Sequence, residues 1–284
     1  LSRRQRQMCI RDSYYIFSIG TSIYYAEMNF TPEILFENIR EVRPTFLTAV
    51  PRIFEKIHAK ILDSVASMTG VKRKLADWSI AVGLQTVPYR QKSQDLPFML
   101  GLKYKIADKL VLNKFRAALG GKVRACSSGG SALSKEVGSF FCGLGITIIE
   151  GYGLTETSPV MTVGHSDFFK FGTVGKPIPG VEVKIQPDGE IVCRGHNVMM
   201  GYYKNEEATN EAIIDGWFHS GDIGEFDEDG LLRITDRKKS LIVTSGGKNV
   251  APQPMEVSLT SNKYIEQCNI VGDDRNFISA LIVP

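Results

Sequence analysis

The stretch EGYGLTET places three kinds of chemistry within a few residues. Gly151 and Gly153 permit close approach of a ligand to the backbone, and Tyr152 between them offers a flat face for a nucleotide base. Thr155 adds a hydroxyl for a phosphate oxygen, and Glu156 adds a carboxylate suited to Mg²⁺. A nucleotide-binding turn is therefore predicted. The stretch alone does not exclude an ordinary strand-end turn, and it lacks the third glycine of the dinucleotide fingerprint.

The elements around this stretch follow the order strand, glycine turn, helix, strand. KVRACSSGG is expected to form a strand that runs into a turn at Gly129 and Gly130, LSKEVGSFFCGLG a helix that begins near Ser134, and ITIIEGYG a second strand. This order is typical of an α/β protein with a parallel sheet and crossover helices. Ligands gather at the carboxyl ends of such strands, so the two glycine turns are expected at one binding edge.

Helices dominate the region before this sheet. TPEILFENIR predicts a helix with Thr31 as N-cap and Pro32 at its first position, and TFLTAV predicts a buried strand that ends at Pro51. A helix with one apolar stripe follows, because apolar residues recur every four positions at Ile53, Ile57, Ile61 and Val65. Further helices are expected at about 72–85 and 102–118.

Antiparallel structure is expected after the sheet. VEVKIQPDGEIVCRG and DIGEFDEDGLLRITD each read as two strands joined by a turn that contains Asp-Gly, which is a hairpin signal. These hairpins predict a β subdomain attached to the first sheet. A new unit is expected after the charged run DRKK: a strand SLIVTS, a glycine turn, a helix PQPMEVSLTS and strands at about 264–272 and 277–283.

Composition gives few clues to a partner. The chain has 284 residues, of which 43% are hydrophobic and 23% charged, and a formal net charge of +3. The first thirteen residues, LSRRQRQMCIRDS, carry that whole excess, and RQMCIRDS resembles the translation of a transposon end used in preparing sequencing libraries. We expect residues 1–13 to be non-native, with a basic nucleic-acid arm as the alternative. The neutral remainder predicts no nucleic-acid partner.

Cysteine and histidine residues are scattered, so neither a disulfide framework nor a metal site held by these residues is expected. The apolar stretch at 14–26 is too short and too interrupted to span a bilayer. We therefore expect a soluble cytoplasmic protein, with peripheral membrane contact and oligomeric state left open.

The motifs taken in order resemble the adenylate-forming acyl-CoA synthetase superfamily, most closely its long-chain fatty acid:CoA ligases. The resemblance spans about residues 14–284 and rests on EVRPTFLTAVPRIFEKI, SSGGSAL, EGYGLTETSPV, GTVGKPIPGVEVKI, GEIVCRGHNVMMGYYKN, GWFHSGDIGEFDEDG, ITDRKKSLIVTSGGKNVAP and YIEQCNIVGDDRNFISALIVP. It implies part of a large AMP-binding α/β domain with an attached antiparallel β subdomain at 14–237, and the start of a small α+β C-terminal domain at 238–284.

The resemblance also implies roles for individual residues. Tyr152 would stack on adenine, Thr155 would contact the α-phosphate and Glu156 would bind Mg²⁺. Asp222 and Arg237 would hold the ribose hydroxyls, a task that suits a carboxylate and a guanidinium. The nucleotide site would also include the glycine turns, at Gly129, Gly130, Ser131, Gly151 and Gly153, although the family usually has Ala where this chain has Ser131.

Two further roles concern the C-terminal unit. Lys239 would lie on the hinge about which this unit swings between half-reactions. Gly246, Gly247 and Lys248 would belong to a glycine loop that faces the pantetheine channel of CoA after the swing.

The implied reaction has two steps with ATP, a fatty acid and CoA as substrates and Mg²⁺ as cofactor. The fatty acid carboxylate attacks the α-phosphate of ATP, which gives an acyl-adenylate and pyrophosphate, and the CoA thiol then displaces AMP. The family's phosphate loop and its terminal adenylation lysine have no counterpart in this sequence, so we expect a fragment that is inactive alone. Another adenylate-forming ligase (medium-chain, aryl or carrier-protein loading) and a non-catalytic nucleotide-binding pseudoenzyme are the alternatives.

Overall fold

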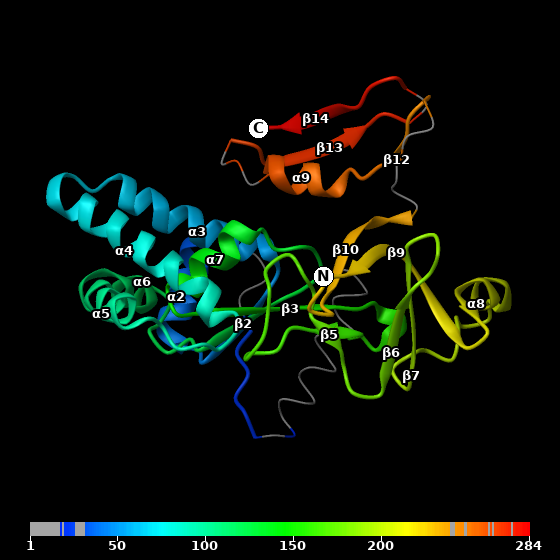
Figure 1. Cartoon of the computed structure of the whole chain (residues 1–284), viewed down its shortest axis with the longest axis horizontal. Coiled ribbons are helices and arrows are strands. Elements are labelled where there is room, and N and C mark those ends of the chain that lie inside the picture. The colour runs from blue at the N-terminus through cyan, green and yellow to red at the C-terminus, as the bar shows by residue number, and fades with distance from the viewer. Residues whose placement is uncertain are drawn as a thin grey trace.

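A computed structural model describes residues 18, 20–25, 32–238, 242–246, 249–260, 262, 264–273 and 275–284. The expected N-cap Thr31, the hinge residue Lys239 and the loop residues Gly247 and Lys248 lie outside the described residues, as does the segment 1–13. Figure 1 shows a helical layer beside a central sheet, a second sheet at the opposite end, and the C-terminal unit above both.

The helical layer shares a core with the first sheet, and the predicted apolar stripe is confirmed. Ile57, Ile61 and Val65 of one helix are buried, and Ile53 packs against the same core. The helices that carry Gly83 (α4) and Gly143 (α7) cross closely. A Cβ on Gly83 would stand only 2.8 Å from the Gly143 carbonyl oxygen. The elements are α2 (Pro32–Val42), α3 (Pro51–Ala66), α4 (Gly70–Arg90), α5 (Phe98–Ala107), η1 (Asp108–Leu112), α6 (Asn113–Ala118) and α7 (Lys135–Gly143).

The first sheet has the order β1-β2-β3-β4-β5, and its first three strands are parallel, as predicted. The last two pair antiparallel, which the sequence pattern did not indicate. The expected burial of the first strand is wrong: Phe46 is 51% exposed, because this strand forms the edge of the sheet. The strands are β1 (Phe46–Ala49), β2 (Ala125–Ser128), β3 (Thr147–Tyr152), β4 (Thr162–Val163) and β5 (Lys176–Pro177).

The second sheet is antiparallel and has the order β10-β9-β7-β6, with β8 paired to β9. Both predicted hairpins are confirmed, since β6 pairs with β7 and β9 with β10. The elements are β6 (Val181–Ile185), β7 (Glu190–Gly195), α8 (Glu206–Ala212), β8 (Ile213–Ile214), β9 (Trp217–Phe226) and β10 (Leu232–Arg237).

The C-terminal unit consists of two short sheets and one helix. β13 pairs antiparallel with β14, and α9 packs on β13. The helix and both late strands match the predicted elements to within a few residues. The elements are β11 (Ile242–Val243), β12 (Asn249–Val250), α9 (Gln253–Thr260), β13 (Gln267–Val271) and β14 (Ser279–Val283).

Two apolar cores hold the main body together. One lies among the helices and the parallel strands, with Phe54, Phe141 and Ile148 almost fully buried at its centre. The other lies under the antiparallel sheet and includes Tyr152 and Ile191. Tyr152 ends β3 of the first sheet, so its side chain joins the two sheets at this point. Among the described residues, no helix is long and apolar enough to cross a membrane.

Candidate nucleotide-binding site

The turn after β3 is built around a close backbone contact at Gly153. A Cβ at this position would stand 1.6 Å from the Pro159 carbonyl oxygen, so no other residue fits without displacing the backbone. The Thr157 hydroxyl closes the turn: it accepts a hydrogen bond from the Leu154 amide (2.9 Å) and donates one to the Pro159 carbonyl (2.8 Å). The short helix η2 (Thr155–Thr157) is thereby held directly after the strand.

Three of the predicted nucleotide residues form a connected chain. The buried Tyr152 hydroxyl donates a 2.6 Å hydrogen bond to Asp222 Oδ2 on β9, and the other carboxylate oxygen pairs with Arg237 Nε at 3.0 Å. These residues come from β3, β9 and β10, and 70 positions separate the first two in the sequence. The fold therefore assembles a tyrosine, a carboxylate and a guanidinium that the sequence only suggested separately.

The three linked side chains differ in charge and in burial. The Asp222 side chain is only 5% exposed, whereas the Arg237 side chain is 63% exposed. Burial, followed by the nearby Asp222 charge, raises the pKa of Tyr152 well above its ordinary value, so the hydroxyl remains a donor at neutral pH. Of these three side chains, the exposed guanidinium of Arg237 is thus the one that a ligand reaches most easily.

Glu156 and Thr155 lie on η2 beside a tyrosine from a later loop. The Tyr202 hydroxyl donates a 3.2 Å hydrogen bond to Glu156 Oε1, and the Glu156 carbonyl oxygen accepts one from the Met199 amide at 2.8 Å. Within the described ranges, no group of three or more His, Cys, Asp or Glu side chains is arranged to hold a metal ion. A single carboxylate fits Mg²⁺ that arrives on a nucleotide, because such Mg²⁺ takes its other ligands from phosphate oxygens and water.

The turn after β2 holds the predicted glycines Gly129 and Gly130, and the segment that follows this turn is hydrogen-bonded to Glu150 on β3. Glu150 on β3 is 9% exposed and accepts hydrogen bonds from the Leu133 amide (3.2 Å) and from the Gly172 amide. Burial outweighs these two donors and raises the pKa of Glu150 to about 7. The open space over Gly129 and Gly130 leaves room for a ligand to approach the backbone.

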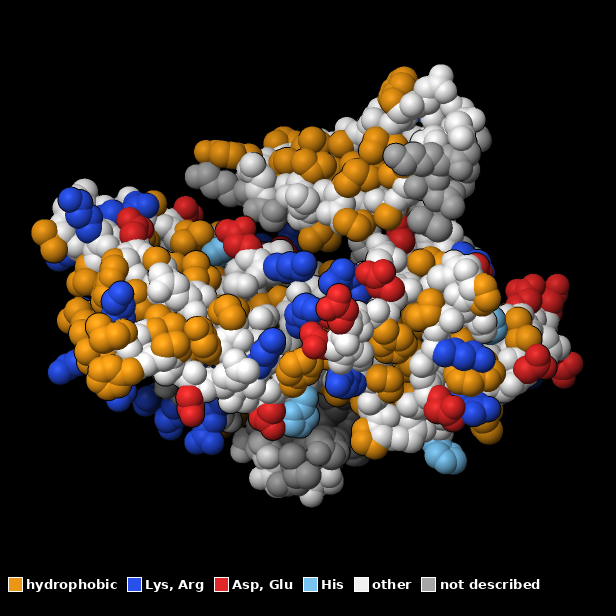
Figure 2. All heavy atoms as spheres, in the orientation of Figure 1, with side chains coloured by type: hydrophobic (Ala, Val, Ile, Leu, Met, Phe, Trp, Pro, Cys, Tyr) orange, Lys and Arg blue, Asp and Glu red, His pale blue; other side chains and the backbone are white. Residues whose placement is uncertain are grey.

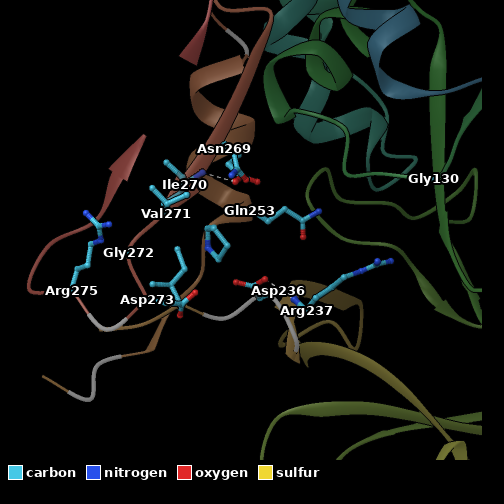
Figure 3. Close-up of a pocket in the computed structure, with 13 residues that line it drawn as sticks. Gly130, Asp236, Arg237, Gln253, Asn269, Ile270, Val271, Gly272, Asp273 and Arg275 are labelled. Carbon is cyan, nitrogen blue, oxygen red and sulfur yellow. Dashed lines mark hydrogen bonds between the residues drawn. The ribbon is translucent and has the colours of Figure 1, made fainter. Parts of the chain in front are cut away.

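A pocket of about 790 Å³ lies between this turn and the C-terminal unit. Figure 3 shows Arg237 extending from β10 toward Gly130, on one side of the pocket. Asp236 lies on the same wall; it is 2% exposed, and its Oδ2 has no hydrogen-bond partner among the described residues. The remaining lining residues belong mostly to the C-terminal unit, including Gln253, Asn269 and Arg275.

The end of β10 is fixed to the second sheet by a network around Glu190. Glu190 is 6% exposed, its Oε1 accepts the Gly221 amide (2.9 Å), and its Oε2 lies 3.0 Å from His219 Nδ1. Lys238 Nζ donates to Glu190 Oε2 at 3.2 Å and to Asp188 Oδ2 at 2.7 Å. Burial alone would raise the pKa of Glu190, but the bonds from its neighbours outweigh burial and lower the pKa below its ordinary value.

The structure brings part of the predicted site together. Tyr152, Asp222 and Arg237 are linked, and Arg237 shares the pocket with Gly130. Gly151 lies on β3 and Ser131 beyond the β2 turn, whereas Gly246 follows β11 in the C-terminal unit. Sequence reasoning gave no role to four residues that shape the site, although each of them lies inside a stretch quoted for the family resemblance. The missed residues are Glu150, Glu190, Tyr202 and Asp236.

Comparison with known proteins gives this geometry a family context. The chain is similar to the long-chain-fatty-acid–CoA ligase FadD15 of Mycobacterium tuberculosis, with 44% identity over 260 residues that cover 90% of this chain and 42% of that protein. It is also similar to the long-chain-fatty-acid–CoA ligase ACSBG2 of Xenopus laevis, with 38% identity over 279 residues that cover 95% of this chain and 37% of that protein. The chain thus spans less than half the length of these relatives.

Solved structures agree on the fold. The O-succinylbenzoate coenzyme A synthetase of Bacillus subtilis in complex with AMP aligns with a TM-score of 0.67 and 21% identity, over 97% of this chain and 48% of that chain. The anthranilate CoA ligase AuaEII in complex with anthranoyl-AMP aligns with a TM-score of 0.63 and 17% identity, over 92% of this chain and 43% of that chain. At these identities the match concerns fold alone.

Family models agree with the relatives. The model described as AMP-binding enzyme matches residues 8–203, and the model described as AMP-binding enzyme C-terminal domain matches residues 239–284. The first match alone covers more than half of the chain. The sequence motifs, the assembled tyrosine, aspartate and arginine, the relatives and the fold therefore agree that this chain belongs to the AMP-binding enzyme family.

Proposed function

We propose that this chain is part of an enzyme that activates a long-chain fatty acid with ATP and transfers the acyl group to CoA. The carboxylate attacks the α-phosphate of ATP and releases pyrophosphate; the CoA thiol then attacks the acyl carbonyl and releases AMP. AMP is a good leaving group, so one difficult thioesterification is divided into two easier transfers.

The connected chain of Tyr152, Asp222 and Arg237 is the observation that carries this proposal. Its tyrosine, carboxylate and guanidinium are the groups expected to contact the base and ribose of a nucleotide. Because Asp222 already accepts a bond on each oxygen, it reaches ribose hydroxyls through its remaining lone pairs, and the guanidinium of Arg237 reaches them from its exposed side.

Glu156, through Mg²⁺, and Thr155 would offset the negative charge of the phosphates. A carboxylate and a triphosphate repel each other, so the reaction needs positive charge at the phosphates. Glu156 would hold the Mg²⁺ of Mg·ATP, which would offset that charge, while the Thr155 hydroxyl, which is exposed on η2, would donate to the α-phosphate. Tyr202 keeps the Glu156 carboxylate oriented through the 3.2 Å hydrogen bond.

The second step is assigned to the C-terminal unit. In this proposal, residues 14–237 are part of the AMP-binding domain and residues 238–284 are the start of the C-terminal domain. Lys239 would lie at the hinge between them. The pantetheine channel of CoA would be lined by Gly246, Gly247 and Lys248. Support comes from the pocket of about 790 Å³ that residues of both parts line. The name of the Mycobacterium relative supports a long-chain fatty acid as the substrate class.

Two measurements test the proposal. Calorimetric titration of this chain with AMP should give binding that weakens about tenfold to a hundredfold in Asp222→Ala, because a charge-assisted hydrogen bond contributes about 1.5–3 kcal/mol. Asp167→Ala is the control, since the Asp167 carboxylate is exposed and lies outside the predicted site. Equal affinity in both variants would count against the assigned site.

The reaction itself is tested with a chain extended to the full length of the relatives. We expect pyrophosphate exchange that depends on long-chain fatty acids, followed by acyl-CoA formation when CoA is added. Exchange only with aryl, medium-chain or carrier-bound acids would overturn the substrate class. Nucleotide binding without any exchange across the panel would favour a non-catalytic protein.

A further inference from the structure

An apolar stripe runs along the exposed side of α5 and its continuation η1. The exposed fractions of its five side chains range from 40% at Leu110 to 84% at Phe98. Figure 2 shows hydrophobic side chains gathered over this helix, at the left of the view. The opposite side of the helix already packs on the core through Tyr104 and Ala107, so the stripe is a second apolar face. It consists of Phe98, Met99, Leu102, Ile106 and Leu110.

Lysines border this stripe on both sides. Projected at 3.6 residues per turn along α5, Lys103 falls on one edge of the stripe and Lys105 on the other, and Lys109 follows in the π-helical turn η1. All three are exposed, and none has an ion-pair partner among the residues that the structure describes. The one acidic residue between Phe98 and Leu112, Asp108, turns inward and pairs with Arg116 at 2.6 Å. Within residues 98–112 the outer face is therefore apolar and positive.

We propose that the outer face of α5 and η1 docks on an anionic lipid bilayer, with the helix parallel to the membrane plane. An apolar stripe flanked by lysines is the pattern of interfacial helices, in which the stripe enters the acyl boundary and the lysines contact anionic headgroups. Lysine stems reach the headgroups while their charges stay in water. Five large exposed apolar side chains on one helix face exceed the isolated ones that a surface ordinarily shows.

The charge pattern favours a bilayer over a second copy of this chain. Two copies that met through their stripes would bring the lysine rows of α5 against one another, and like charges at close range repel. An anionic membrane instead attracts every lysine of the row and accepts the whole stripe at once. The proposal does not rest on the proposed activity, because it uses only the exposed face of α5.

Vesicle sedimentation tests the docking surface. The 284-residue chain is mixed with vesicles of phosphatidylcholine alone and with vesicles of about 70% phosphatidylcholine and about 30% phosphatidylglycerol, whose surface is anionic. We expect binding to the anionic vesicles that weakens as salt rises from about 0.05 to 0.5 M, since exposed charges are screened over that range. Absence of binding to anionic vesicles would overturn the proposal.

Matched variants separate the stripe from other surface residues. The pair Phe98→Ser and Met99→Ser should lower the partition coefficient about a hundredfold, because two apolar side chains no longer enter the bilayer. The pair Met200→Ser and Tyr203→Ser, which are at least as exposed, should leave it unchanged.

For the charges, Lys105→Glu with Lys109→Glu should lower partitioning about thirtyfold or more. The exposed pair Lys56→Glu with Lys122→Glu is the control. An equal loss in stripe and control variants would overturn the proposal.

Fluorescence locates the helix directly. In Phe98→Trp, brominated lipid should quench emission beyond the background of Trp78 and Trp217, and in Tyr203→Trp it should not. Loss of sedimentation by the stripe variants together with a change from dimer to monomer in lipid-free buffer would identify a second copy as the occupant. That result, or unquenched Phe98→Trp on bound vesicles, would refute membrane docking.

Discussion

Glu150→Gln is expected to change how the unfolding free energy of this chain depends on pH. Burial raises the pKa of Glu150 to about 7 in the folded chain, against an ordinary value of 4.5. Between these two pH values the unfolded chain has lost this proton and the folded chain still holds it. Stability that is present below pH 4.5 is therefore lost as pH rises toward 7, and above about pH 7 the loss is complete.

The size of this loss follows from the difference between the two pKa values. A difference of 7 against 4.5 corresponds to about 3 kcal/mol of unfolding free energy at pH 8, since each pKa unit contributes about 1.4 kcal/mol. Glutamine has the shape of the protonated acid and cannot ionise. Relative to the parent, Glu150→Gln should therefore gain about 3 kcal/mol between pH 4.5 and pH 8.

Glu190→Gln provides a control with the opposite sign. Glu190 is buried to a similar degree, but its hydrogen bonds, which include those to His219 and Lys238, lower its pKa. Its contribution to stability is present above pH 4.5 and is lost as pH falls through the lowered pKa. Glu190→Gln should thus be most destabilising near neutral pH and progressively less so in acid.

Urea unfolding at several pH values between 3.5 and 8, followed by circular dichroism, measures both variants against the parent. A flat difference between Glu150→Gln and the parent across this range would refute the reasoning, because it would mean that Glu150 titrates alike in both states. Parallel pH profiles for the two variants would refute it as well, since burial alone would then govern both carboxyl groups.

Three further outcomes are expected. Tyr152→Phe should lower the unfolding free energy by about 2 kcal/mol, and a double-mutant cycle with Asp222→Asn in urea unfolding should give a coupling of about 1 kcal/mol or more; additive losses would contradict the 2.6 Å hydrogen bond. Gly153→Ala should cost more than about 3 kcal/mol in thermal unfolding, because its Cβ would meet the Pro159 carbonyl, whereas Gly129→Ala should cost little. Phe54→Ala should cost about 3–5 kcal/mol in the same assay, as a fully buried ring is removed from the first core; a loss below 1 kcal/mol would contradict that burial.

Local signals predicted most of the elements. The four-residue apolar period placed α3, and Asp-Gly turns placed both hairpins of the second sheet, because these signals arise within a single element or a single turn. Ser134 caps α7 as its position suggested, since its hydroxyl accepts a hydrogen bond from the Val137 amide. The candidate site residues were predicted from motifs whose order along the chain was distinctive, and their roles stay predictions.

Features that depend on distant neighbours were not predictable. The exposure of β1 follows from its place at the sheet edge, which no residue within it specifies. Tyr152 offered a flat face in the sequence, but only the fold places its hydroxyl against Asp222, 70 positions later. Glu150, Glu190 and Asp236 look like ordinary acidic residues on strands until the packing of other elements removes water from them.

The anchoring of Lys238 has a consequence for how the two parts of the chain can move. Lys238 forms ion pairs with Asp188 and Glu190 of the β6–β7 hairpin. These contacts join it to the second sheet, which also contains the preceding residue, Arg237. In the domain movement proposed for the second step, we therefore expect Lys238 to stay with the second sheet. Arg237 and Asp222 lie on neighbouring strands of that sheet, so a nucleotide bound to them would stay with the sheet while the residues on the opposite wall of the pocket changed.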